Sequence, residues 1–279
     1  MKKLLAHIKL FRPLNLTIGA FVVIITASIL KKTDQVSIWI IALFVVFCYN
    51  AAANAINDYF DIETDKVNRP NRPLVTGDVK PKTALFLAIF LFFIGTILAF
   101  TLTLSATFIA VAIVLPLMIF YSLWFKGLPL LGNFVISLIL GLTFIFAGAA
   151  LQNMGQMIIP ALLAFGLTIV RELVKDICDV EGDRKAKLKT FPIIAGVKRA
   201  WSLVTVFAVL IGIGVLLPYA FGKYNYLYII FVLIGVEIPL IITVFSRMKF
   251  PAITAAEHSA KLLKFSTIAG VLAVWLGSI

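Results

Sequence analysis

Two short acidic stretches carry most of the side chains in this sequence that could do chemistry. Asn57 to Asp65 and Lys175 to Asp183 share the pattern Asp-x2-Asp-x-Glu-x-Asp, and the second copy follows the first by 118 residues. Only 13 residues of the chain are acidic, and eight of these lie in the two stretches. Long apolar runs surround both. Carboxylates are costly in such surroundings, so their concentration indicates a pair of cation sites.

The spacing of the aspartates predicts that each stretch forms a one-sided set of ligands. At i, i+3 and i+7 the carboxylates lie on one face of a helix. The aspartates with this spacing are Asp58, Asp61 and Asp65 in the first stretch and Asp176, Asp179 and Asp183 in the second. Asn57 joins the first face, whereas Glu63 and Glu181 point away from the two faces and are expected to be solvated or to support the ligands. Oxygen donors of this kind suit Mg²⁺, which commonly takes further ligands from a substrate phosphate.

A pair of Mg²⁺ sites predicts a substrate with a diphosphate group held between them. Nearby basic residues would neutralise the remaining charge, and these are Arg69, Arg72, Lys126, Lys185 and Lys189. A diphosphate whose charge is absorbed in this way is a good leaving group. The apolar helices would then bind a lipid tail, and the candidates to contribute are Phe44, Phe47, Phe144 and Phe146. The alternative is a solvated acidic loop paired with neighbouring Lys and Arg.

The elements that must position these residues are membrane-spanning helices. The chain is 62% hydrophobic and 14% charged, with a mean hydropathy of +1.07. Such a composition is typical of a membrane protein. Nine apolar runs of about the length that crosses a bilayer predict an all-α, multi-pass protein. They are approximately 14–30, 38–56, 83–104, 106–122, 133–151, 157–174, 197–218, 226–246 and 261–278.

The basic residues are distributed very unequally between the two ends of these runs. With nine spans, all but Lys31, Lys32 and Lys223 of the 25 basic residues fall on one side. The positive-inside rule therefore places the N-terminus and both acidic stretches in the cytoplasm and the C-terminus outside. This one-sidedness argues for a cell-membrane protein and against a nucleic-acid partner.

The sequence predicts one transmembrane domain over residues 1–279. The offset of 118 residues fits a four-helix unit followed by a similar unit, and chance convergence is the alternative. Cys48 and Cys178 lie inside predicted helices, which excludes a disulfide framework and a zinc ligand set. No oligomeric state follows from the sequence.

The motifs resemble those of the UbiA superfamily of intramembrane prenyltransferases. The resemblance is carried by Asn57-Asp58-x2-Asp61-x3-Asp65, Asn71-Arg72-Pro73-Leu74 and Asp179-x3-Asp183. It extends to Arg12-Pro13 before the first span and to Tyr121-Ser122-x3-Lys126 before Gly132-Asn133. It therefore covers the whole chain.

The resemblance implies a ring of helices around a central cavity, with two Mg²⁺ ions that bind a prenyl diphosphate. Carried over, Asn57, Asp61 and Asp65 serve one ion, and Asp179 and Asp183 serve the other. Asp61 and Asp179 are the expected catalytic positions. Substrate contacts are expected from Lys126, Arg72, Asn15, Tyr121 and Lys189. Asp58 and Asp176 match weaker positions, where a carboxylate binds metal through water or positions a basic residue or the acceptor.

Within the superfamily, the string from Asn57 to Leu74 is similar to that of the archaeal lipid enzymes. These join geranylgeranyl diphosphate to the free hydroxyl of geranylgeranylglyceryl phosphate, a membrane lipid precursor, and form the second ether bond of archaeal lipids. Prenylation of an aromatic acceptor, as in quinone biosynthesis, is the alternative activity. A cation-coupled transporter is the alternative outside enzymes, but the acids are predicted at helix ends beside Lys and Arg, which favours anion handling.

Overall fold

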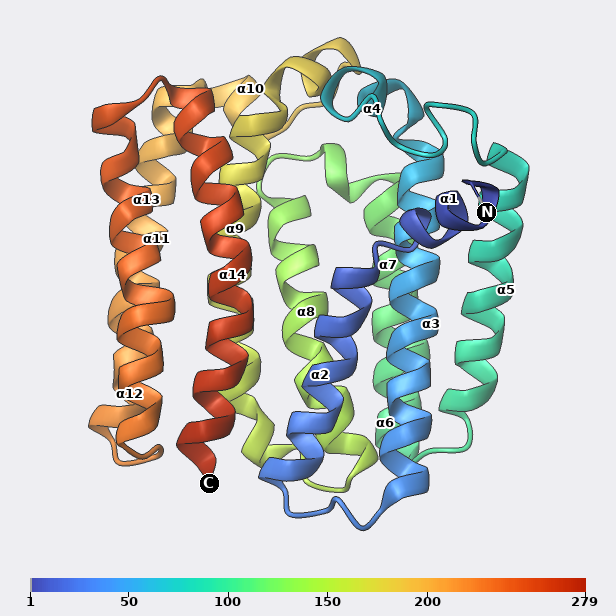
Figure 1. The fold of residues 1–279 in the computed structure, drawn as a ribbon, viewed down its shortest axis with the longest axis vertical. Coiled ribbons are helices and arrows are strands. Elements are labelled where there is room, and N and C mark those ends of the chain that lie inside the picture. Colours follow the sequence, from blue (N-terminus) through green and yellow to red (C-terminus); the bar gives the residue numbers. More distant parts are fainter. Residues whose placement is uncertain (1) are drawn as a thin grey trace. The chain divides into compact units, whose positions relative to one another are not determined.

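All regular structure in the described chain, residues 2–279 of a computed structural model, is helical (Figure 1). The first half contains α1 (Lys2–Leu10), α2 (Pro13–Ile29), α3 (Val36–Phe60), α4 (Ile62–Asn68), α5 (Pro81–Ala99), α6 (Leu104–Thr107), η1 (Phe108–Val114), α7 (Leu115–Leu123) and η2 (Phe125–Gly127). The second half contains α8 (Leu131–Ala150), η3 (Gly155–Met157), α9 (Ile158–Lys185), α10 (Phe191–Ala195), α11 (Val197–Ala220), α12 (Tyr226–Val232), η4 (Leu233–Glu237), α13 (Ile238–Lys249) and α14 (Ala252–Ser278). The predicted all-α class is confirmed.

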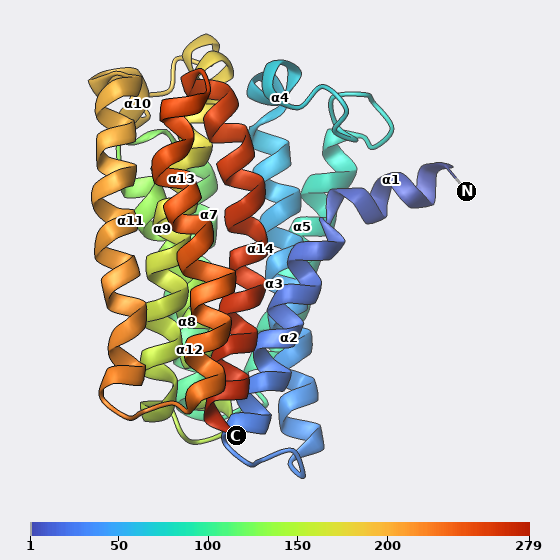
Figure 2. The ribbon, with the colours of Figure 1, turned by 60° about the vertical axis from the view of Figure 1, so that its left-hand side comes forward.

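The helices have the length and composition of membrane spans. Eight in the described residues could cross a bilayer, and the bent pair α1–α2 makes up to nine. The two helices of this pair meet at 55°, and Figure 2 shows α1 turned away from the line of α2. The predicted division of 83–122 is also present, because α5 ends at Ala99 and α6 begins at Leu104. There the Thr103 side chain caps the new helix by accepting from the Ala106 N–H.

Two of the spans contain a π-helical segment that ends two positions before a proline. In η1 the segment precedes Pro116, and in η4 it precedes Pro239. Proline lacks an N–H, and its ring clashes with the carbonyl four residues earlier, so the hydrogen-bond ladder must adjust there. These π-helical segments were not predicted from the sequence.

The chain divides into two compact units. The first unit comprises Met1–Lys126, Leu142–Gln156 and Lys185–Lys187, and the second comprises Gly127–Gly141, Met157–Arg184 and Leu188–Ile279. Each unit contains one acidic stretch. An internal duplication stays a prediction, and the two units are described separately below.

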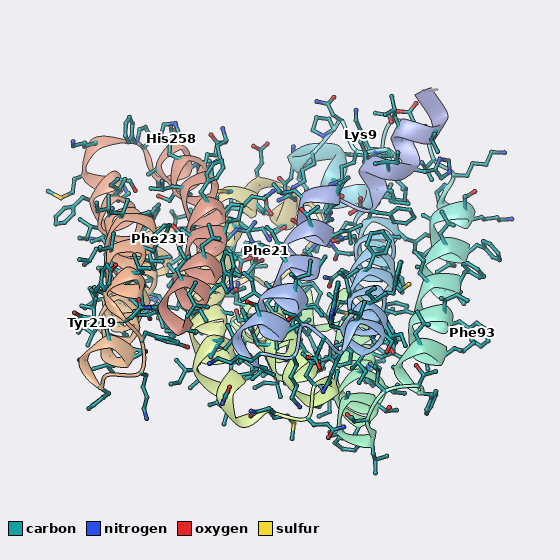
Figure 3. The ribbon with its side chains drawn as sticks, turned by 60° about the horizontal axis from the view of Figure 1, so that its bottom comes forward. Lys9, Phe21, Phe93, Tyr219, Phe231 and His258 are labelled. Carbon is teal, nitrogen blue, oxygen red and sulfur yellow. The ribbon has the colours of Figure 1, made fainter. Side chains whose placement is uncertain are left out.

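In the first unit α3 is the central helix, with α2 and α5 packed against it. Close approach depends on small residues, as is typical of membrane helices. A Cβ at Gly95 of α5 would lie 2.6 Å from the ring of Tyr49 on α3, and one at Gly19 of α2 would lie 2.6 Å from Asn50 Nδ2. The outer face of α5 is apolar. Phe93, for example, is 61% exposed and points away from its helix, as expected for a lipid-facing side chain (Figure 3).

Candidate active site

The first acidic stretch lies at the junction of α3 and α4. Asp61 ends α3 and begins α4, with φ −91° and ψ 4°, so the stretch is two helices and not the single helix end that the spacing predicted. Hydrogen bonds nevertheless continue across the junction, from Asp61 N to Asn57 O (2.9 Å) and from Asp65 N to Asp61 O (2.7 Å). The i to i−4 pattern keeps the acids close together. α4 ends at Asn68, two residues before Pro70, because proline disfavours continuation of the helix.

Asp58 forms ion pairs with two arginines from other parts of the chain. Its side chain is 3% exposed, and its Oδ1 accepts hydrogen bonds from both Arg12 and Arg72. Arg12 stands at the α1–α2 bend in the left-handed region, with φ +53°. The bend is also fixed by Asn54, whose Nδ2 donates to Phe11 O at 3.0 Å. Asp58 therefore positions basic groups, one of the roles that the sequence left open for it.

Asp65 lies seven residues, about two helical turns, beyond Asp58 and shares Arg72 with it. Its side chain is 2% exposed, with Arg72 Nη1 at 3.1 Å from Oδ2 and Arg69 Nη1 at 3.5 Å from Oδ1. Burial raises the pKa of Asp65 above its usual range, Arg72 opposes the shift, and Asp61 and Asp58 add to it. Burial, and next the positive charge of Arg12, lower the pKa of Arg72. The charges of Asp65 and Arg72 therefore depend on each other and on the charged groups around them.

Asp61 is paired with a fourth basic residue of this cluster. Lys126, in the short turn η2, donates its Nζ proton to Asp61 Oδ2. The Asp61 side chain is 9% exposed and the Lys126 side chain 25%. Residues 65 positions apart in sequence are therefore brought into one ion pair, as the proposed diphosphate site requires.

The first cluster has oxygen atoms suited to a divalent cation. Asn57 Oδ1 and Asp65 Oδ2 are buried and accept no hydrogen bond from the described residues. Among residues 2–279, no three His, Cys, Asp or Glu side chains converge closely enough to hold a metal ion by themselves. Mg²⁺ commonly binds through one or two carboxylates and completes its shell with water and substrate phosphate. The donor set fits such a shared site.

The second acidic stretch lies on α9, which continues through it to Lys185. Asp176 Oδ2 accepts a hydrogen bond from Asn133 Nδ2 of α8 at 2.9 Å. Four residues earlier, Glu172 is 5% exposed and is paired with Arg171 (2.9 Å) and Lys175 (2.5 Å). Asp183 is 4% exposed, and Asp179 is half-buried.

Sequence reasoning missed the local roles of Asn133 and Glu172. Both residues could have been noticed in the sequence. Glu172 precedes Asp176 by about one helical turn and lies inside an apolar run. Asn133 is a polar residue at the start of another such run. In both cases a lone polar residue within an apolar span was the available clue.

Three further residues were predicted to contact the substrate. Asn15 is half-buried in the first turn of α2, where its backbone N–H donates to Arg12 O (2.8 Å). Tyr121 is half-buried on α7. Lys189 is exposed between α9 and α10, and its backbone N–H donates to Gly127 O (3.0 Å). Their substrate contacts stay predictions.

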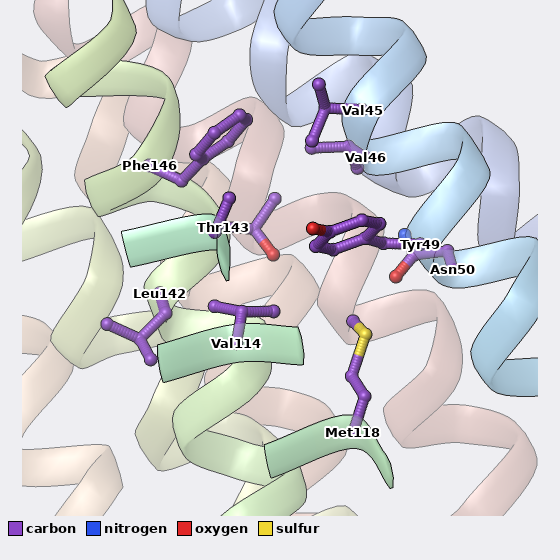
Figure 4. A pocket seen from close by; sticks show the side chains of 10 residues that line it. Val45, Val46, Tyr49, Asn50, Val114, Met118, Leu142, Thr143 and Phe146 are labelled. Atoms are coloured by element: carbon purple, nitrogen blue, oxygen red, sulfur yellow. The ribbon is translucent and has the colours of Figure 1, made fainter. Parts of the chain in front are cut away.

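An apolar pocket lies further along the helices that carry the first cluster. Figure 4 shows the side chains that line it. Its lining consists of Val45, Val46, Tyr49, Asn50, Ala110, Val114, Met118, Leu142, Thr143 and Phe146. Of the four phenylalanines expected at a lipid tail, Phe146 lines this pocket. Phe44 and Phe47 are exposed, and Phe144 is buried.

These features define a class of protein. The fold is that of an all-α, multi-pass membrane protein, and a buried cluster of carboxylates and basic groups lies above an apolar pocket in one unit. That arrangement suits an amphiphilic, anionic substrate.

The chain belongs to the UbiA prenyltransferase family, whose sequence profile matches residues 19–277. It is therefore a membrane prenyltransferase.

Relatives and solved structures agree with this assignment. The chain is 32% identical to digeranylgeranylglyceryl phosphate synthase of Methanosphaera stadtmanae, over 96% of each chain. It is 33% identical to the synthase of Thermococcus gammatolerans, over 99% of each chain. A solved structure of digeranylgeranylglyceryl phosphate synthase in membranes has a TM-score of 0.77 and 31% identity, and the match covers 100% of this chain and 99% of that one. A UbiA homolog from Archaeoglobus fulgidus bound to DMAPP and Mg²⁺ shares the fold, with a TM-score of 0.67, 18% identity and coverage of 95% and 98%.

Proposed function

We propose that this protein transfers a geranylgeranyl group from geranylgeranyl diphosphate to the hydroxyl of geranylgeranylglyceryl phosphate, with Mg²⁺ as cofactor. The observation that carries the proposal is the first unit, where a cluster rich in Arg and Lys lies at the end of α3 and includes Lys126, just after the Leu104–Leu123 span. An apolar pocket is lined by residues further along α3 and that span. The acceptor is supported by relatives that cover nearly the whole chain and are named digeranylgeranylglyceryl phosphate synthase.

The donor would bind with its diphosphate at the cluster and its tail in the pocket. Tyr49 precedes Asn57 by eight residues on α3, which is about 12 Å of helix rise. Met118 precedes Lys126 by the same number. The lining is mostly aliphatic and aromatic, so a prenyl chain there would exclude water from the reacting carbon.

Asn57, Asp61 and Asp65 would hold one Mg²⁺, and Asp179 and Asp183 a second. The structure of the Archaeoglobus fulgidus homolog contains Mg²⁺ with a prenyl diphosphate, which supports use of this ion. When bound, Mg²⁺ neutralises the diphosphate and makes it a better leaving group. Lys126 would exchange its Asp61 partner for a phosphate oxygen, and this would free the carboxylate as a ligand.

The transfer breaks the bond between the allylic carbon and the diphosphate oxygen and forms an ether bond to the glycerol oxygen. The hydroxyl proton must leave at the same stage. Asp58 Oδ1 already accepts hydrogen bonds from Arg12 and Arg72, so we do not assign this proton to Asp58. The departing diphosphate or Asp176 would take it.

The orientation follows from the basic residues, with the N-terminus and both acidic stretches in the cytoplasm and the C-terminus outside. A phosphorylated, water-soluble end of each substrate would then be supplied from the cytoplasm.

The direct test is transfer of radiolabelled geranylgeranyl diphosphate by the purified protein to a panel of acceptors. Geranylgeranylglyceryl phosphate should be alkylated in a Mg²⁺-dependent manner, and chelation with EDTA should stop the reaction. If an aromatic acid is alkylated and the glyceryl lipid phosphate is not, the proposed acceptor is wrong. If neither is alkylated in the presence of Mg²⁺, the proposed reaction itself is wrong.

A further inference from the structure

The pocket of the first unit has a defined far end, away from the acidic cluster. Val45 precedes Asn57 by 12 residues on α3, about 18 Å of helix rise. Ala110 is separated from Lys126 by 16 residues, twice as many as Met118. In Figure 4 Val45 and Phe146 lie at one end of the pocket, and Met118 lies at the other. Phe146 is the largest side chain at that far end.

The part of α8 that carries Phe146 is firmly held within the first unit. Two carbonyls just beyond it accept hydrogen bonds from other segments, Ala149 O from Thr103 (2.9 Å) and Leu151 O from Lys32 (2.6 Å). Both donors lie at the ends of spans opposite to the acidic cluster. Phe146 is 3% exposed, and Ala147 next to it is fully buried.

One side wall of the pocket is equally fixed. Tyr49 donates to or accepts from Thr96 Oγ1 at 2.9 Å, and its ring meets Phe92 edge-on at 5.7 Å. Behind the ring, Gly95 leaves no room for even a methyl group. The tail therefore cannot lengthen the pocket by displacing Tyr49 sideways towards α5.

We infer that Phe146 sets the upper length of the prenyl chain that the enzyme accepts. A tail that enters past Met118 would run along Tyr49 and meet the Phe146 ring at the far end of the pocket. This inference rests on the proposed function, since it takes the pocket as the site of the donor tail. Length selection at a rigid end wall is a steric exclusion, which discriminates more strongly than loss of one apolar contact.

The test compares Phe146→Ala with Phe144→Ala in the full-length protein. Both changes remove the same side chain from the same buried helix, but Phe144 does not line the pocket. The measurement is kcat/KM for prenyl diphosphates of three, four and five isoprene units. Phe146→Ala should raise the ratio for five units over four by at least about tenfold relative to the wild type. Phe144→Ala should keep the ratio within about twofold of the wild type.

A second variant tests the same end wall in the opposite direction. Val45→Phe adds a ring at the far end and should lower the ratio for four units over three. If Phe146→Ala fails to fold, Phe146→Leu and Val45→Phe still test whether the far end of the pocket limits the chain length. If both of these variants, or a folded Phe146→Ala, keep the wild-type ratios of kcat/KM between chain lengths, Phe146 does not set the upper length of the prenyl chain.

The outcome also separates this inference from the proposed function. Donor selection is measured with whichever acceptor is used, so an aromatic acceptor would disprove the proposed acceptor but still test Phe146. A wild-type protein that consumes no prenyl diphosphate would overturn both. Normal transfer to the glyceryl lipid, with selection that is unchanged in Phe146→Ala, would overturn only the length assignment.

Discussion

The two acidic stretches have the same spacing but different partners. In the first, each aspartate contacts a basic side chain, and Arg12, Arg72 and Lys126 come from outside the stretch. In the second, Asp176 is bonded to the neutral amide of Asn133, and the nearby basic residues Arg171 and Lys175 are paired with Glu172. Spacing therefore defines a set of potential ligands, whereas partners from other helices determine what each carboxylate does.

The backbone also differs between the two stretches. The first stretch changes helix at Asp61, whereas α9 continues through the second to Lys185. Asp61 can therefore turn towards Lys126 of η2, while the second set keeps regular helical spacing. We expect two metal sites that are related but not identical.

The largest expected effect is the loss of a central ligand from either stretch. Asp61→Ala and Asp179→Ala should each lower turnover by about 1,000-fold or more, because each removes a carboxylate whose contribution to leaving-group stabilisation cannot be replaced. The measurement is initial rate of prenyl transfer at saturating Mg²⁺. Circular dichroism and the Tm of each variant in detergent are the controls for folding.

If one of these variants retains wild-type turnover at ordinary Mg²⁺ concentrations, the reaction does not need both stretches. The comparison would then be between one catalytic and one structural region.

The two stretches should differ in their Mg²⁺ requirement when the first residue of each is replaced. Asn57 has a buried, unbonded amide oxygen, whereas its counterpart Lys175 is paired with Glu172. Asn57→Ala should raise the Mg²⁺ concentration for half-maximal activity about 10- to 100-fold, as expected for loss of a group at a metal site. Lys175→Ala should change it less than about threefold, since an ammonium group cannot be a ligand. A Mg²⁺ titration of both variants measures the difference, and equal shifts would remove the asymmetry.

Much of the fold could be predicted because membrane spans leave a strong signal in the sequence. The runs of apolar residues, the break near Thr103 and the stop before Pro70 all follow from local composition. The π-helical segments were missed because they depend on how a neighbouring proline disturbs hydrogen bonding within a long apolar run.

The candidate site was predictable in its residues but not in its pairing. Spacing identified Asp58, Asp61 and Asp65 as neighbours, and proximity in sequence suggested Arg69 and Arg72. The contact between Arg12 and Asp58 joins residues 46 positions apart, and it depends on the bend between α1 and α2. The pairings of Asn133 with Asp176 and of Glu172 with Arg171 and Lys175 were not predicted for the same reason, since they arise from helix packing and a buried ion pair.

A moderate effect should separate the auxiliary aspartates. Asp58→Asn keeps the shape of the side chain but removes the charge that binds two arginines, so the KM for the prenyl diphosphate should rise about tenfold, equivalent to the loss of one charge-assisted hydrogen bond. Unfolding should also become easier by about 3 kcal/mol, since two partly buried cations lose a counter-charge. Asp176→Asn retains an acceptor for Asn133, and its stability should stay within about 1 kcal/mol of the wild type.

Steady-state kinetics and denaturant unfolding in detergent measure both quantities. A larger loss of stability in Asp176→Asn than in Asp58→Asn would show that the second stretch, and not the first, depends on its charges.

The smallest effect is expected at the glutamates, where the two stretches should behave alike. The Glu63 side chain is 76% exposed and is paired with Lys66, and Glu181 is also exposed. Exposed ion pairs contribute little free energy, so Glu63→Gln and Glu181→Gln should each keep turnover and the Mg²⁺ requirement within about twofold of the wild type. The matched comparison is Asp61→Asn, which makes the same chemical change at a buried carboxylate. If Glu181→Gln lowers the Mg²⁺ affinity and Glu63→Gln does not, then the second stretch uses its glutamate as a ligand.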